Sequence, residues 1–261
     1  MPTATVNGTT LDYDLIGTGT PLLLIHGGLI ARSEWRLQIE PLAQSCRLIV
    51  PDVRGHGASG KGGDYSMKLF AEDFVALLEN LGIARAIVCG HSMGGTVAQV
   101  MAADYPDRVI GLILAETNYG VGNEPMMRFA AGATTALTRL IGVKSFLKMG
   151  ARTMKANDPQ IVSAIQAAFQ RQADDPANAR NIIDAMNAYD GSALLARIHC
   201  PTLVIIGADN RLARQQGEHM AKTIPNARLT HIPNAGHGAN WDNAPAFNAA
   251  VLEFTGGLPA T

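Results

Sequence analysis

The chain has 261 residues, of which 47% are hydrophobic and 16% charged, and its formal net charge is −1 at neutral pH. This balance is typical of a globular protein with a large buried core, and it excludes a disordered chain. Because no run of Lys or Arg stands out that would neutralise phosphates or bind an anionic surface, neither nucleic acid nor a membrane is an expected partner.

The first residues lack a basic segment followed by an apolar stretch, and no window is long and apolar enough to span a bilayer. We therefore expect a cytoplasmic protein. Cys46, Cys89 and Cys200 share no C-x-x-C spacing, so each is interpreted as a small buried residue outside any disulfide. The expected partner is a small-molecule substrate, and assembly into a homo-oligomer is left open.

Short apolar runs alternate with longer amphipathic stretches along the chain. After a hairpin turn at Asn7-Gly8, continuous apolar runs predict strands at 21–27, 47–52, 84–90, 108–116, 201–209 and 227–233. Helical spacing predicts helices at 34–45, 66–82, 92–104, 211–224 and 243–254. The predicted fold class is α/β, with a mostly parallel central sheet flanked by helices.

The alternation breaks once, between residues 119 and 197, where segments rich in Ala, Met and Leu predict helices and no strand. We interpret this segment as a helical cap inserted between two parts of a core, residues 1–118 and 198–261. It leaves the sheet at the carboxyl end, where loops gather, and should cover the site there. Its apolar side chains are candidates for a pocket wall: Met126, Met127, Phe129, Leu140, Phe146 and Met149.

The strongest local motif is Gly90-His91-Ser92-Met93-Gly94, which lies between a predicted strand and a predicted helix. It matches G-x-S-x-G in the strand-turn-helix context that the motif requires. A nucleophile on such a tight turn leaves no room for side chains at the flanking positions, which explains the two glycines. The motif predicts Ser92 as a catalytic nucleophile.

At this point the chain resembles the α/β-hydrolase family, in its serine hydrolase branch. The His26-Gly27-Gly28 segment is similar to the family's oxyanion loop, residues 51–60 to the loop after its fourth strand, and residues 234–254 to its histidine loop and last helix. The four segments follow the family's order. The resemblance implies an oxyanion hole made by the backbone N–H groups of Gly28 and Met93.

A serine hydroxyl needs a base within hydrogen-bond reach, and the base must come from a distant loop. His237 is the best candidate, because it follows the last predicted strand in the Gly-flanked loop AGHGAN. Among the other histidines, His26 and His91 are expected to orient backbone near the site. No H-E-x-x-H or comparable spacing occurs, so we expect neither a metal nor any other cofactor.

The triad acid has two candidates. The family most often places it three residues past the glycine that ends the strand at 201–207, but Asn210 occupies that place and Asp209 lies one residue early. Some family members carry the acid at the end of the preceding strand, where this chain has Glu116. A charge there is costly unless it is paired. We favour Glu116 and keep Asp209 as the alternative.

These residues predict a serine hydrolase that cleaves a small, largely apolar carboxylic ester, lactone or thioester through an acyl-enzyme on Ser92. Two alternatives stay open. The same constellation could hydrolyse a carbon–carbon bond next to a carbonyl or use peroxide as a perhydrolase. From a different class of protein, a small-molecule receptor could keep the pocket with little turnover.

Overall fold

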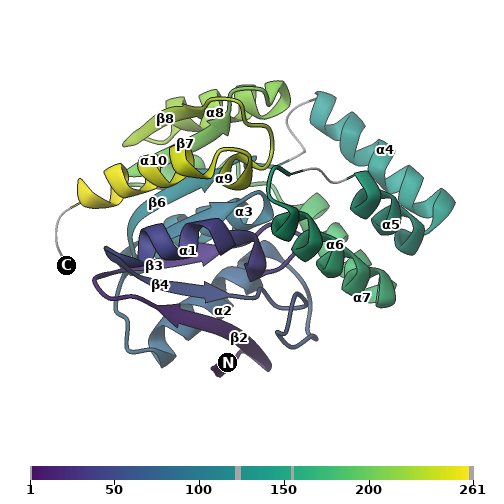
Figure 1. The fold of residues 1–261 in the computed structure, drawn as a ribbon, viewed down its shortest axis with the longest axis horizontal. Coiled ribbons are helices and arrows are strands. Elements are labelled where there is room, and N and C mark those ends of the chain that lie inside the picture. The colour runs from purple at the N-terminus through teal and green to yellow at the C-terminus, as the bar shows by residue number, and fades with distance from the viewer. Residues whose placement is uncertain (1, 121–124, 154–155, 259–261) are drawn as a thin grey trace.

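The computed structural model describes residues 2–120, 125–153 and 156–258 (Figure 1). Within them, eight strands form one sheet in the order β1-β2-β4-β3-β5-β6-β7-β8. The strands are β1 (Thr3–Val6), β2 (Thr9–Ile16), β3 (Thr20–Ile25), β4 (Cys46–Pro51), β5 (Ala86–His91), β6 (Val109–Ala115), β7 (Thr202–Gly207) and β8 (Ala227–Ile232). The pairs β1–β2 and β2–β4 are antiparallel and the others parallel, so the predicted mostly parallel sheet is confirmed.

Helices connect the strands as the periodicity predicts. They are α1 (Arg36–Ala43), α2 (Met67–Asn80), α3 (Met93–Asp104), α4 (Pro125–Ile141), α5 (Val143–Thr153), α6 (Pro159–Asp174), α7 (Pro176–Ala188), α8 (Arg211–Thr223), α9 (Ala239–Asp242) and α10 (Ala244–Gly256), with short 3₁₀ turns η1 (Arg32–Trp35), η2 (Pro106–Arg108) and η3 (Leu195–Arg197). None of the described helices is long and apolar enough to cross a membrane.

The sheet is buried on both faces, which explains why its strands are continuous apolar runs. In β3, Leu22 and Leu24 pack with α1 and α10, whereas Leu23 and Ile25 pack with α2 and α3 on the opposite face. All four side chains are fully buried. This packing fixes the register of the strands and therefore the positions of the loops at their carboxyl ends. Cys46 and Cys89 are buried, Cys200 is partly buried, and all three are free thiols.

The segment between β6 and β7 is helical, as its composition predicts. Its described residues form α4, α5, α6 and α7, which Figure 1 shows in teal and green beside the carboxyl ends of the parallel strands. An isolated bridge pairs Gly120 with Asp190 where the segment leaves and rejoins the sheet. The exact domain boundaries at 118/119 and 197/198 stay a prediction.

Candidate active site

Ser92 occupies a sharp turn between β5 and α3. Its backbone dihedrals are φ 52° and ψ −118°, a region that costs energy for any residue with a side chain. A Cβ added at Gly90 would collide with the carbonyl of Gly94, and one at Gly94 would collide with the carbonyl of Ile25. The two glycines of the motif are therefore required by close backbone approach, and the turn directs the Ser92 hydroxyl into a cavity.

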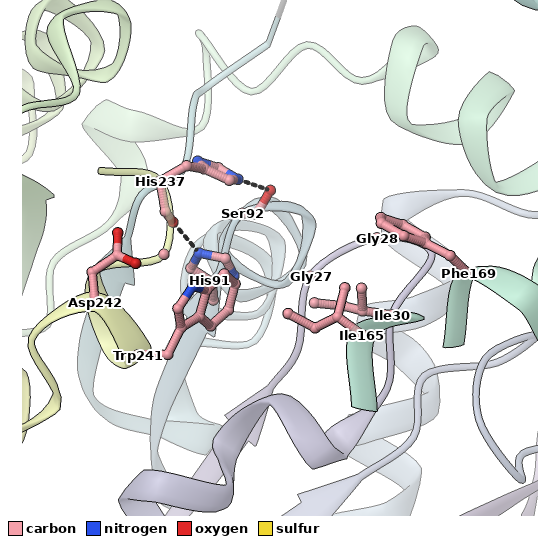
Figure 2. Close-up of a pocket in the computed structure, with 11 residues that line it drawn as sticks. Gly27, Gly28, Ile30, His91, Ser92, Ile165, Phe169, His237, Trp241 and Asp242 are labelled. Carbon is pink, nitrogen blue, oxygen red and sulfur yellow. Dashed lines mark hydrogen bonds between the residues drawn. The ribbon is translucent and has the colours of Figure 1, made fainter. Parts of the chain in front are cut away.

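His237 lies in the loop between β8 and α9, and its ring reaches Ser92 across 145 positions of sequence. Its Nε2 is 3.2 Å from the Ser92 Oγ, as the dashed line in Figure 2 shows. This is the upper end of the range in which a base can take a hydroxyl proton before substrate binds. The His237 side chain is 58% exposed, so a proton can also be exchanged with water.

Glu116 and Asp209, the two candidate acids, lie in different environments. Glu116 follows β6 with a left-handed φ of 49°, and its side chain is fully buried. Its Oε2 lies 3.5 Å from Nδ1 of His237. Asp209 is exposed, and the described contacts of the His237 ring include Glu116 and not Asp209. The structure thus brings Ser92, His237 and Glu116 together in one line.

The buried Glu116 carboxylate is held by two donors from the turn after β7. The backbone N–H of Gly207 donates to Oε1, and the side-chain amide of Asn210 donates to Oε2. Asn210 also caps α8, because its Oδ1 accepts the N–H of Ala213 at 3.2 Å. Asn210, which occupies the position where the resemblance led us to expect the acid, therefore serves as a hydrogen-bond donor to Glu116 at the end of the neighbouring strand. In the sequence, Asn210 marks only a departure from the family's usual acid position, and no local pattern indicates its contact with Glu116.

Gly28 and Met93, the expected oxyanion donors, lie next to each other. Met93 is the first residue of α3, where a backbone N–H has no partner within the helix. A Cβ added at Gly28 would lie 3.4 Å from the Met93 Sδ and 2.6 Å from the Sδ of Met186 in α7. Because Gly28 has no side chain, the Met186 sulfur packs close to its backbone. Gly28 and Ser92 line the same cavity.

The loop that carries Gly28 is braced by two neutral histidines. His26 Nε2 accepts the N–H of Val53 at 2.9 Å, and His56 Nε2 accepts the N–H of Leu29 at 3.0 Å. Burial and, to a smaller extent, the nearby His26 lower the pKa of His56 to about 3. Both rings therefore act as fixed acceptors that tie the loop after β3 to the loop after β4, as the sequence suggested for His26.

A cavity of about 320 Å³ opens at Ser92 (Figure 2). Its size is typical of a site for a small ligand. Its described lining is Gly27, Gly28, Ile30, His91, Ser92, Ile165, Phe169, His237, Gly238, Trp241 and Asp242. Ile165 and Phe169 come from α6, so the inserted helices do contribute to the wall. Asp242 is the acidic member, and no Lys or Arg is among these described residues.

The side chains expected to form the apolar wall were mostly the wrong ones. Phe129 is 79% exposed and Leu140 is 83% exposed on α4, and Met149 is also exposed. Phe146 packs against the main core instead. The side chains of Met126 and Met127 lie outside the described residues. Composition identified a segment rich in apolar residues, but only the packing of α6 onto η1 determines which of its helices meets the site.

Comparison with known proteins agrees with the fold described above. The family model described as "alpha/beta hydrolase fold" matches residues 20–244. A putative carbamate hydrolase RutD from Pseudomonas savastanoi pv. phaseolicola is 30% identical over 248 residues, covering 90% of this chain and 93% of that protein. A 2-hydroxy-6-oxononadienedioate/2-hydroxy-6-oxononatrienedioate hydrolase from Burkholderia vietnamiensis is 29% identical, covering 93% and 89%.

Among solved structures, the enol-lactonase from Burkholderia xenovorans LB400 superposes with a TM-score of 0.85 at 28% identity. The superposition covers 98% of this chain and all of the enol-lactonase. The names of these proteins give different substrates, but each is named as a hydrolase or a lactonase. The chain belongs to the alpha/beta hydrolase fold family, and it is a hydrolase of that family.

Proposed function

We propose that this hydrolase cleaves a small, largely apolar carboxylic ester, lactone or thioester through an acyl-enzyme on Ser92. The observation that carries the proposal is the line Ser92, His237, Glu116, with 3.2 Å from Oγ to Nε2 and 3.5 Å from Nδ1 to Oε2, opening into an apolar cavity. A serine, a base and an orienting acid in this arrangement form the triad that activates a hydroxyl for acyl transfer.

Acylation follows from this geometry. Ser92 Oγ attacks the carbonyl carbon of the substrate while Nε2 of His237 takes the hydroxyl proton. The Glu116 carboxylate stabilises the imidazolium that forms, and the N–H groups of Gly28 and Met93 bind the developing oxyanion. The carbon–oxygen or carbon–sulfur bond then breaks, and His237 returns its proton to the leaving group.

Deacylation repeats the sequence with water. His237 takes a proton from a water molecule, whose oxygen attacks the acyl carbon of the ester on Ser92. When the tetrahedral intermediate collapses, the proton returns to Ser92 Oγ and the carboxylic acid leaves. The exposed His237 ring supports this step, because its edge is open to water.

The lining of the cavity supports an uncharged acyl group. Ile30, Ile165 and Phe169 supply apolar surface, and the acidic Asp242 lies on the same cavity. A carboxylate on the substrate would meet like charge there in a partly water-excluded site, where repulsion is stronger than in bulk water. We therefore propose a neutral substrate. We also propose that α4 to α7 form a cap over it.

This preference disfavours one alternative. The name of the Burkholderia vietnamiensis relative describes a dicarboxylate substrate for carbon–carbon hydrolysis. Such a substrate needs cationic partners, and the described lining carries Asp242 in place of Lys or Arg. The receptor alternative rested on a displaced acid, and the contact between Glu116 and His237 supports turnover instead.

The proposal is tested with two p-nitrophenyl esters of equal acyl length. One is p-nitrophenyl hexanoate, which is neutral, and the other is mono-p-nitrophenyl adipate, which ends in a carboxylate. We expect kcat/KM for the neutral ester to be at least about 10-fold higher, corresponding to about 1.4 kcal/mol. Adding hydrogen peroxide with monochlorodimedone as a halogenation reporter checks perhydrolysis in the same assay.

Two results would contradict the proposal. If the protein hydrolyses neither of these esters and no simple lactone, Ser92 does not perform the proposed reaction. A preference for the adipate ester would show that the cavity accepts a carboxylate, which contradicts the proposed neutral substrate and removes the argument against carbon–carbon hydrolysis of dicarboxylates.

A further inference from the structure

A second buried carboxylate lies behind the catalytic residues. Glu34, in η1, is 1% exposed. Its Oε2 accepts the backbone N–H of Gly27 at 2.8 Å, and its Oε1 accepts the side-chain amide of Asn240 at 3.3 Å. Gly27 precedes the proposed oxyanion donor, and Asn240 belongs to the helix that follows the His237 loop. The Glu34 carboxylate therefore contacts the loop of Gly27 and Gly28 on one side of Ser92 and the helix α9 that follows the His237 loop on the other.

His91 connects this carboxylate to His237. The His91 ring precedes the nucleophile on β5 and is 1% exposed. Its Nδ1 lies 2.6 Å from Oε1 of Glu34, and its Nε2 lies 2.8 Å from the backbone carbonyl oxygen of His237. Figure 2 shows the second contact as a dashed line below the His237 ring. His91 thus spans the distance from Glu34 to the backbone of the base.

These contacts assign a positive charge to His91. Its Nε2 faces the carbonyl oxygen of His237, which can only accept, so Nε2 carries a proton. Its Nδ1 lies within ion-pair distance of the Glu34 carboxylate, without hydrogen-bond geometry, and a carboxylate so close favours the imidazolium. Glu34 accepts hydrogen bonds from the backbone N–H of Gly27 and the side-chain amide of Asn240. Burial is the largest single effect and lowers the pKa of His91, but the Glu34 carboxylate, the His237 carbonyl and Glu116 together raise it by more, so the pKa of His91 stands above its ordinary value.

We propose that Glu34 is a positioning residue for catalysis, acting with His91 to hold the Gly27–Gly28 loop and the His237 loop at fixed places around Ser92. The proposal rests on the function proposed above. Glu34 is not among the described residues that line the cavity, and the described contacts of the Ser92 hydroxyl do not include it. Its effect passes through Gly27 to the oxyanion donor and through His91 to the backbone of the base.

The physical need for such a pair lies in the precision of acyl transfer. A displacement of about 1 Å at a catalytic group can cost about 10²-fold in rate. The His237 side chain is 58% exposed, so its ring is restrained on few sides. The buried Glu34–His91 pair restrains the backbone of His237 through the hydrogen bond from His91 Nε2 to the His237 carbonyl. Trp35 and Trp241 pack against the His91 ring and hold it in place.

The chain offers a matched control in Asp73. Its carboxylate pairs with Arg54 at 2.7 Å, and both side chains are 1% exposed, so burial and ion pairing resemble those of Glu34 and His91. Arg54 otherwise donates to the backbone of Asn7 and Gly62, far in sequence from the loops at Ser92. Asp73→Asn leaves the Arg54 charge buried without its partner, and Glu34→Gln leaves the buried His91 ring without its carboxylate, so both changes lower stability. Only one pair contacts the catalytic loops.

The test compares Glu34→Gln with Asp73→Asn in the full-length protein. We expect both variants to melt below wild type. For p-nitrophenyl hexanoate, kcat should fall at least about 10-fold in Glu34→Gln with KM changed less than about 3-fold, whereas kcat of Asp73→Asn should stay within about 2-fold. An unchanged kcat in Glu34→Gln, or equal losses of kcat in both variants, would overturn the proposal.

A double variant separates positioning from stability and serves if Glu34→Gln does not fold. Glu34→Gln/His91→Gln removes both charges together, so it leaves neither charge unpaired and should melt closer to wild type. If the pair positions the loops, kcat stays at least about 10-fold below wild type although stability returns. Recovery of kcat together with the melting temperature would show a purely structural role and overturn the proposal.

Nitrogen-15 NMR of the histidine rings gives a readout that does not depend on turnover. In wild type at about pH 7.5, both His91 ring nitrogens should show shifts of protonated nitrogen, and in Glu34→Gln one should shift to the unprotonated range. A neutral His91 in wild type would contradict the assignment. If wild type hydrolyses no ester, the proposed function fails, whereas the NMR comparison still decides the charge of His91.

Discussion

The serine turn and the inserted helices differ sharply in how they are packed. Every residue of β5 is buried, and in α3 only Asp104 escapes burial. In α4, by contrast, Phe129 and Leu140 are 79% and 83% exposed. The proposed nucleophile joins a fully buried strand to a helix that is buried except at its last residue, whereas in α6, which lines the cavity, only Ile161, Ile165, Gln172 and Ala173 are buried.

This difference separates two requirements of a hydrolase. Bond cleavage needs a nucleophile, a base and donors held to fractions of an ångström, and close packing supplies that. Substrate choice needs a wall that can differ in shape without disturbing the sheet. Variants in the first region should therefore change kcat, and variants in the second should change the preference among substrates.

The largest expected effect is the loss of the nucleophile. Ser92→Ala should lower kcat by at least about 10³-fold with little change in melting temperature, because the partly exposed hydroxyl contributes little to packing. His237→Ala should cost about as much, and the double variant little more, since the two residues act as one unit. Steady-state kinetics with p-nitrophenyl hexanoate measures all three. Additive losses would separate His237 from the serine mechanism.

The next effect distinguishes the two acids. Glu116→Gln keeps the shape of the side chain but removes the charge that stabilises the imidazolium, so kcat should fall by about 10² to 10⁴. Asp209→Asn should change kcat less than about 3-fold, because Asp209 is exposed. The two variants are compared at equal substrate saturation. The reverse order would move the acid to Asp209, and two mild variants would exclude both.

A smaller effect concerns the free energy of unfolding at acidic pH. We expect its pH dependence to come from the buried histidines His26 and His56 in the loops after β3 and β4. His56 is held neutral with a pKa of about 3, and burial also lowers the pKa of His26. The unfolded chain takes up a proton near pH 6.5 while the native His56 does not, so stability is lost as pH falls. Between pH 7 and pH 5 this amounts to about 2 kcal/mol for His56.

Urea unfolding at these two pH values measures the loss. His56→Gln should lose about 2 kcal/mol less than wild type between pH 7 and pH 5, whereas residues 119–197 contain no histidine and should contribute nothing of this kind. An identical loss in wild type and His56→Gln would show that His56 is not held neutral in the native protein.

The smallest expected effect tests the cavity wall. Phe169→Ala on α6 removes apolar surface from the cavity, so kcat/KM for hexanoate relative to acetate should fall about 10-fold, with kcat for acetate nearly unchanged. Leu140→Ala on α4 removes an exposed side chain of similar character and should change neither ratio nor melting temperature. A response of Leu140→Ala equal to that of Phe169→Ala would place α4, too, against the substrate.

The sheet and the serine turn could be predicted because local patterns encode them. Buried parallel strands are continuous apolar runs, and the turn at Ser92 demands glycine on both sides. His237 could be found because glycines flank it after the last strand. Each of these signals lies within a few residues of the feature that it predicts.

Other features depend on contacts that no short pattern contains. Glu116 and Asp209 are both carboxylates at strand ends, and only the tertiary structure shows that Asn210 donates a hydrogen bond to Glu116. Glu34 resembles an ordinary charged residue on an amphipathic stretch until η1 turns it inward. The exposed Phe129 and the cavity-lining Phe169 are both aromatic residues on helices, and tertiary packing alone separates them.

The central claim, that Ser92 is the nucleophile, is tested most directly by covalent labelling. A fluorophosphonate probe reacts with an activated serine, and peptide mass spectrometry locates the adduct. We expect one adduct on the peptide containing Gly90 to Gly94, placed on Ser92 by fragmentation, and none in Ser92→Ala or His237→Ala. An adduct on another residue, or no adduct on a protein that still hydrolyses the hexanoate ester, would contradict the serine mechanism.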